Sequence, residues 1–176
     1  GQVEEFEHCF ADTPRCPGQP VYAPAKLTNF EGTFNVNAPD NRIPQGGGTA
    51  GAASWTVSIV APGCTISDVN LELDITHTFM GDLTVSLNHE GAGTMFAQIC
   101  GSTDDWLGTL DDDAMGPPTA GCGNGDPSLF TTTQSGSALD GFDGKPASGD
   151  WTLDINDAFG GDSGVLNASR FYGTCE

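Results

Sequence analysis

The feature that most constrains the fold is an alternation of polar and apolar residues that returns in several short runs. It occurs in residues 54–60, 69–76, 83–87 and 151–155. Alternation with a period of two places one face of a strand on a core and the other in water, which is typical of antiparallel sheets. Turns rich in glycine separate the runs, and no segment after residue 30 has a helical period. The pattern predicts an all-β, antiparallel β-sandwich.

The first part of the chain has a different composition. Prolines crowd residues 13–24, and two of the cysteines, Cys9 and Cys16, lie in the first sixteen residues. We therefore expect residues 1–32 to form a Cys/Pro-rich N-terminal extension or linker. Residues 33–176 then form the sandwich, and their number suits one domain.

The six cysteines are the second constraint. No pair has the CxxC spacing of zinc ribbons or thioredoxin-type sites, so disulfides formed in an oxidising compartment are the preferred interpretation. They predict a disulfide-stapled, secreted or extracellular protein. Six cysteines allow many pairings; the three that we favour are Cys9–Cys16, Cys64–Cys175 and Cys100–Cys122.

The charge restricts the partners. The chain carries 24 acidic against 5 basic residues, a net charge of −19. Phosphate contacts depend on Lys and Arg, so we expect no nucleic-acid partner. No apolar run is long enough to span a bilayer, so we expect no membrane insertion. The acidity fits simple solvation, calcium-rich surroundings or a basic partner.

The segment between residues 101 and 149 has few strand-like runs and many aspartates. A loop of this length in a compact domain is functional or is held by something. The triplet Asp111, Asp112 and Asp113 is the best candidate for a structural calcium ion, because calcium takes six to eight oxygen ligands. Trp106 lies in the same segment, where it either stacks on a sugar or plugs its own loop.

The run Gly161-Asp162-Ser163-Gly164 looks like the nucleophile loop of chymotrypsin-like proteases. That chemistry needs a histidine base oriented by an aspartate, and only thirteen residues follow Ser163. A hairpin turn would contain the same four residues, because glycine, aspartate and serine all favour turns. His77 alternates with Leu73 and Ile75, so we expect it to be packed and hydrogen-bonded rather than a ligand. We expect no catalytic residues and no enzyme activity.

Four blocks in the same order resemble the P domain, also called the homo B domain, of proprotein convertases, kexin-like proteases and bacterial subtilisin-like secreted proteases. The most specific block is His77-Thr-Phe-Met-Gly-Asp-Leu83. The others are Gly149-Asp-Trp-Thr-Leu-Asp-Ile-Asn-Asp157 with Asp162-Ser-Gly-Val-Leu166, Ala38-Pro-Asp-Asn41, and Asp111-Asp-Asp-Ala114. The resemblance covers about residues 34–173.

The resemblance implies a jelly-roll β-sandwich of the galactose-binding-domain type. It also implies a non-catalytic accessory domain that packs beside a protease domain, or another domain of the same secreted protein, and stabilises or regulates it. Members can carry a structural calcium, and the candidate ligands at matching positions are Asp40, Asp82, Asp111, Asp112 and Asp113. The alternative is a carbohydrate-binding or adhesive module, with Trp106 as its stacking residue, because fold does not fix function.

Overall fold

A computed structural model of the chain describes residues 27–97, 100–116, 118–123, 132–133 and 139–176. These residues form strands and short 3-10 helices, and no α-helix occurs among them. None of the helices in this part is long and apolar enough to cross a membrane. The elements are β1 (Asn29–Thr33), β2 (Arg42–Ile43), β3 (Gly51–Ile59), β4 (Ile66–His77), η1 (Met80–Asp82), β5 (Leu83–His89), β6 (Ala92–Ala97), β7 (Trp106–Leu110), η2 (Pro118–Gly121), β8 (Thr132–Thr133), η3 (Asp140–Phe142), β9 (Gly149–Asp157) and β10 (Gly164–Cys175).

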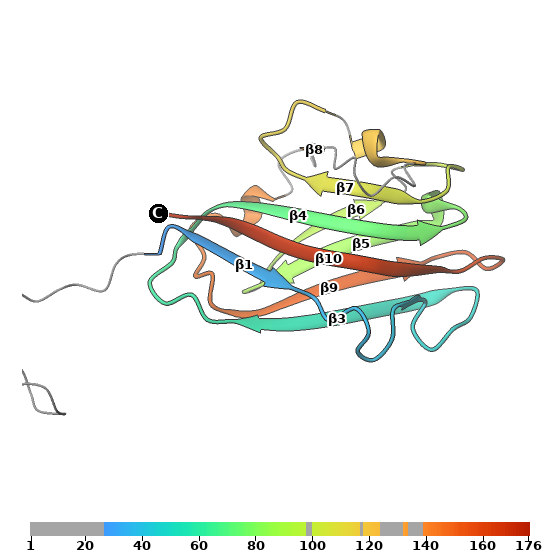
Figure 1. Cartoon of the computed structure of the whole chain (residues 1–176), viewed down its shortest axis with the longest axis horizontal. Helices are drawn as coiled ribbons and strands as arrows, with labels where there is room; N and C mark the ends of the chain where they lie inside the picture. The colour runs from blue at the N-terminus through green and yellow to red at the C-terminus, as the bar shows by residue number, and fades with distance from the viewer. Residues whose placement is uncertain (1–26, 98–99, 117, 124–131, 134–138) are drawn as a thin grey trace, which may run out of the picture.

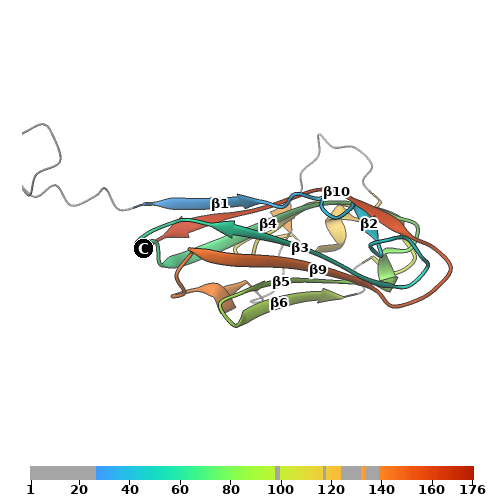
Figure 2. The ribbon, with the colours of Figure 1, turned by 90° about the horizontal axis from the view of Figure 1, so that it is seen from below.

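The strands form two sheets that pack face to face. One sheet has the order β1-β10-β4-β7-β8 with β2 beside β10, and the other has the order β3-β9-β5-β6 (Figure 1). The edge-on view separates β1 and β10 from β5 and β6 as two layers (Figure 2). Every pairing is antiparallel except the short one between β7 and β8. The expected antiparallel β-sandwich is confirmed.

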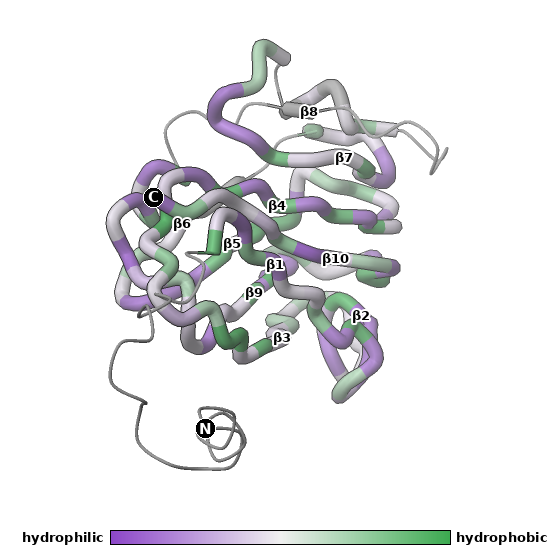
Figure 3. The backbone as a smooth tube through the Cα atoms, turned by 60° about the vertical axis from the view of Figure 1, so that its left-hand side comes forward, coloured by the Kyte–Doolittle hydropathy of each residue, from purple (hydrophilic) through white to green (hydrophobic). Residues whose placement is uncertain are grey.

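The alternation in the sequence becomes alternation of burial. In β5 every second residue is buried, and β9 follows the same rule over most of its length. Hydrophobic and hydrophilic residues succeed one another along β4 in the same way (Figure 3). The inward residues of the two sheets form one continuous core, so the period of two in the sequence is the direct cause of the two layers.

An aromatic stack occupies the centre of this core. The Trp151 ring lies between the rings of His89 and Phe171, with centroids 4.0 Å and 4.3 Å away. His89 is 3 % exposed, and both of its ring nitrogens lie within hydrogen-bond distance of a carbonyl oxygen, of Asp150 at 2.9 Å and of Pro146 at 2.7 Å. A neutral imidazole has a single N–H, so the ring donates a hydrogen bond to one of these two carbonyl oxygens, and this contact joins the end of β5 to the start of β9.

Two disulfides close the described part of the chain. Cys64, before β4, pairs with Cys175 at the end of β10, and Cys100 pairs with Cys122. These are two of the pairings favoured from the sequence, and they are confirmed. Cys9 and Cys16 lie outside the described residues, as does most of the expected N-terminal extension. The sheet itself begins before residue 33, because β1 pairs with β10 from Asn29 onward.

Candidate functional site

Two groups of side chains have the spacing of metal ligands among the described residues. The acidic cluster contains Asp68, Asp111 and Asp112, and the histidine cluster contains His77, Asp157 and Asp162. In each group one ligand atom per residue lies within 4.8 Å of the others. The sequence analysis named Asp111 and Asp112 but not Asp68, and it did not join the three residues of the histidine cluster.

Strand pairing assembles the acidic cluster. β7 runs antiparallel to β4, with Leu110 opposite Leu71. The residues that follow Leu110 therefore continue toward the start of β4, where Asp68 lies. The Asp113 amide donates a hydrogen bond to Oδ1 of Asp111 at 2.8 Å, which fixes the turn at this point. The aspartate-rich segment that follows β7 therefore lies near the carboxylate of Asp68, which belongs to β4, an inner strand of the sheet.

The carboxylates of this cluster resist simultaneous ionisation. Burial, together with a hydrogen bond to Asp140 and the negative charges nearby, raises the pKa of Asp112 to about 7. The pKa of Asp68 is raised by burial first and then by the charges of Asp111, Asp113 and Asp143. Like charges held this close favour a shared proton or a bound cation. Because every donor is an oxygen, the donor set suits calcium.

Two of the other calcium candidates, Asp40 and Asp82, lie elsewhere and belong to neither cluster, and Asp113 follows Asp112 without being one of the three grouped residues. The Asp40 carboxylate accepts hydrogen bonds from the backbone amides of Arg42 and Gly46, at 3.0 Å and 3.1 Å, and from the Arg42 guanidinium at 3.2 Å. The first of these bonds is the main reason that the pKa of Asp40 is lowered. Asp82 ends η1, and its carbonyl oxygen accepts a hydrogen bond from the Ala158 amide at 3.1 Å. The structure therefore brings Asp111 and Asp112 together but not Asp40 or Asp82.

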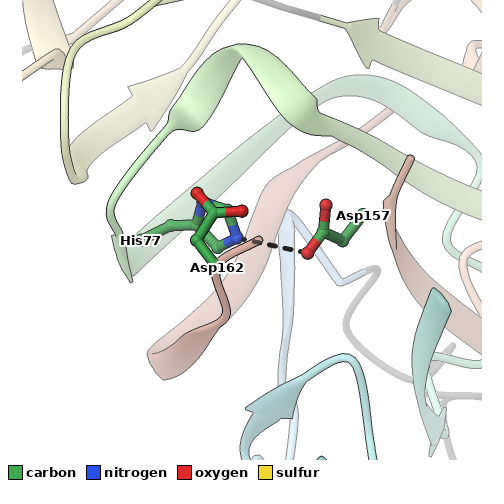
Figure 4. Close-up of side chains that lie close together, drawn as sticks. All are labelled: His77, Asp157 and Asp162. Carbon is green, nitrogen blue, oxygen red and sulfur yellow. Dashed lines mark ion pairs between the residues drawn. The ribbon is translucent and has the colours of Figure 1, made fainter. Parts of the chain in front are cut away.

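The histidine cluster forms where three segments meet. His77 ends β4, Asp157 ends β9, and Asp162 lies in the turn before β10 (Figure 4). Nε2 of His77 lies 3.5 Å from Oδ2 of Asp157, and both side chains are fully buried. Nδ1 lies 3.8 Å from Oδ2 of Asp162, whose side chain is 19 % exposed. Burial is also the main reason that the pKa of Asp157 is raised.

A glycine permits this packing. A Cβ atom on Gly164 would lie 2.3 Å from the Thr76 carbonyl oxygen and 2.6 Å from Cδ2 of His77. The last glycine of the Gly-Asp-Ser-Gly run is therefore required by close approach to β4. Ser163 is exposed, and the ring nitrogens of His77 face the carboxylates of Asp157 and Asp162. The expected burial of His77 is confirmed, as is its position on the same face as Leu73 and Ile75, since all three are buried.

Trp106 is not available to a ligand. It is the first residue of β7 and is 1 % exposed. A Cβ atom on Gly121 would lie 2.6 Å from Nε1 of its indole, so the neighbouring segment packs directly on the ring. The proposed role in sugar stacking is wrong, and the tryptophan plugs its own loop. The sequence placed it in a loop because all five residues of β7 are buried, which removes the alternation.

The fold of this chain is similar to part of a solved protein structure. No protein-family model matches it, and no curated protein matches it either. The crystal structure of a serine protease of Aeromonas sobria matches with a TM-score of 0.50 and 15% sequence identity, over 91% of this chain and 28% of that chain. The same protease in complex with its chaperone matches with a TM-score of 0.49 and 15% identity, over 85% and 26%. The chain thus spans about a quarter of the protease's length, and the likeness concerns the fold.

Proposed function

We propose that this chain is a non-catalytic accessory domain of P-domain type, joined to a serine protease domain in a secreted protein. The observation that carries the proposal is the match of nearly the whole chain to about a quarter of the Aeromonas sobria serine protease. A shared fold of this kind is expected if one module occurs in both proteins, although fold alone does not fix function.

The positions of the resemblance blocks support this proposal. Trp151, Leu153 and Ile155 are all fully buried, and Leu83 is 1 % exposed. A Cβ atom on Gly81 would lie 2.5 Å from the Gly101 carbonyl oxygen, so no larger residue fits there. The residues that carry the resemblance therefore specify packing. Because these residues are buried in the core, a neighbouring domain would contact other residues, on the surface of the sandwich.

A groove beside β1 is the surface that we assign to the protease domain. Its volume is about 640 Å³, and Leu27, Phe30, Ile59 and Val60 contribute its apolar lining. Val60 is 89 % exposed, which is unusual for so apolar a residue at the rim of a groove. Leu27 lines the groove and leads into β1, so the upstream part of the chain joins the sandwich beside the groove. Burial of apolar area at about 25 cal/mol per Å² provides the attraction.

Val60→Asp in the full-length protein tests this surface. It should shorten the half-life of peptidase activity on heating, because the charge would be buried against the neighbouring domain. Met115→Asp is the matched control, since Met115 is 99 % exposed and lies outside the groove. A half-life equal to the control would contradict the assignment of the groove.

We also propose that the acidic cluster holds a structural calcium ion, with Asp68, Asp111 and Asp112 as ligands and Asp113 beside them. The proposal is supported by the all-oxygen donor set and by the raised pKa values, because a cation relieves the repulsion that raises them. Calcium at about 100 times its dissociation constant should stabilise the chain by about 2.7 kcal/mol.

The test is thermal unfolding with calcium and with chelator. Asp112→Asn should reduce the calcium-dependent rise in melting temperature while leaving the chelated protein at least as stable as wild type, because one repelling charge is gone. Asp104→Asn, at an exposed aspartate outside both clusters, is the control. A melting curve of the wild type that is unchanged by chelator at neutral pH would remove the calcium proposal.

A further inference from the structure

Two buried polar atoms of the histidine cluster face each other across 3.5 Å. They are Nε2 of His77 and Oδ2 of Asp157, and both side chains are 0 % exposed. Neither atom has a hydrogen-bond partner among the described residues. Leaving a buried polar atom unsatisfied destabilises the folded state. A positively charged or proton-bearing species between the two atoms would remove this cost.

The other polar atoms of both side chains have neighbours of their own, and the tautomer of His77 decides whether Nδ1 donates to the Phe79 carbonyl oxygen or accepts from the Phe79 amide. Nδ1 of His77 lies 3.1 Å from the Phe79 carbonyl oxygen. A proton on Nδ1 donated to that oxygen leaves the lone pair of Nε2 directed toward Asp157, and metal-binding histidines commonly use a backbone carbonyl in this way. Oδ1 of Asp157 accepts a hydrogen bond from the Phe159 amide at 3.3 Å, which leaves Oδ2 free.

The spacing and chemistry of the group select a class of ion. Tetrahedral zinc with bonds of about 2.0–2.1 Å separates its ligand atoms by about 3.4 Å, close to the 3.5 Å between Nε2 and Oδ2. Asp162 offers a third carboxylate in the same cluster, in which one ligand atom of each residue lies within 4.8 Å of the others. Its Oδ2 lies 3.8 Å from Nδ1 of His77 and accepts a hydrogen bond from the Thr78 hydroxyl at 2.9 Å. An imidazole among the donors favours zinc-like ions over calcium.

We infer that His77, Asp157 and Asp162 bind one divalent transition-metal ion of the zinc class, with a fourth position for water. The partly exposed Asp162 provides the route from solvent. The ion joins the end of β4, the end of β9 and the turn before β10, so it closes one end of the sandwich. This site is separate from the acidic cluster and does not depend on the proposed protease partner.

Titration of the metal-free chain with Co²⁺ and then Zn²⁺, in the presence of excess Ca²⁺, tests the site. One equivalent of Co²⁺ should give the visible absorption of a four-coordinate ion, and Zn²⁺ should displace it. Asp162→Asn changes a partly exposed residue and should preserve the fold. It should weaken Zn²⁺ binding, measured by calorimetry, by at least about tenfold, since loss of even an outer-shell partner of a metal ligand typically costs 10–100-fold. Asp104→Asn should bind Zn²⁺ as wild type does.

The alternative is a hydrogen bond from a protonated Nε2 to Asp157. The Phe79 amide, which lies 3.2 Å from Nδ1, would then donate to that nitrogen. Nitrogen-15 NMR should show Nε2 protonated without metal and deprotonated after one equivalent of Zn²⁺. Retention of the Nε2 proton at saturating Zn²⁺ would overturn the inference. So would Zn²⁺ binding that Asp162→Asn leaves unchanged while Asp111→Asn with Asp112→Asn abolishes it.

Discussion

The two confirmed disulfides should contribute unequally to stability, because they close loops of very different length. Cys64 and Cys175 are 111 residues apart in sequence, whereas Cys100 and Cys122 are 22 apart. In the chain-entropy treatment a disulfide stabilises by restricting the unfolded chain, and the effect grows with the logarithm of loop length. The corresponding contributions at 25 °C are about 4.8 kcal/mol for the long loop and about 3.4 kcal/mol for the short one.

Paired substitutions by alanine isolate this effect. One variant combines Cys64→Ala with Cys175→Ala, and the other combines Cys100→Ala with Cys122→Ala. Cys64 and Cys100 are both largely buried, at 3 % and 9 % exposed, so the packing lost in the two variants is similar. The long-loop variant should be less stable than the short-loop variant by about 1.4 kcal/mol.

Urea unfolding followed by tryptophan fluorescence is the assay, because Trp151 lies in the aromatic core. For a chain of this size, 1 kcal/mol corresponds to about 2–4 °C in melting temperature. In a thermal unfolding experiment the melting temperatures of the two variants should therefore differ by roughly 3–6 °C. Equal losses, or a greater loss for the Cys100–Cys122 pair, would show that loop closure does not govern the contribution of these bridges.

The remaining predictions concern close packing, pH and the buried tryptophan. Gly164→Ala should cost about 1–3 kcal/mol in urea unfolding through overpacking on His77, whereas Gly141→Ala, with open space around it, should cost less than half as much; equal costs would contradict the packing argument. Without calcium, stability should fall as pH rises from about 4 to about 7, because the raised pKa of Asp112 makes the folded state bind more protons than the unfolded state in that range. Asp112→Asn should flatten this profile, and an unchanged profile in pH-dependent melting would refute the assignment. Trp106→Ala should destabilise the chain by about 3–5 kcal/mol, and calorimetry with sugars should show the same result before and after the change.

Where burial alternated, the sequence predicted the strands well. β3, β4, β5 and β9 were all found from a period of two, because one face of each strand packs on the core. β7 was missed because burial on both faces leaves no alternation. For the same reason Trp106 was predicted to lie in a loop, and the aspartates around it strengthened that prediction.

The clusters were predicted less well than the strands, because they join residues that are distant in sequence. Asp111 and Asp112 stood out as adjacent carboxylates, but their approach to Asp68 depends on the register between β7 and β4. Similarly, His77 and Asp157 were both part of the resemblance blocks, and the inward position of His77 was visible in its alternation with Leu73. Nothing in the sequence indicated that the ends of β4 and β9 would bring Nε2 and Oδ2 to 3.5 Å.

The central claim is that this sandwich stabilises a protease domain in the same secreted protein. The most direct test is the half-life of peptidase activity on heating, measured for the full-length protein and for a version that lacks residues 27–176. The account predicts peptidase activity in the full-length protein and a markedly shorter half-life after the deletion. Unchanged thermal inactivation, or a full-length protein without peptidase activity, would contradict it.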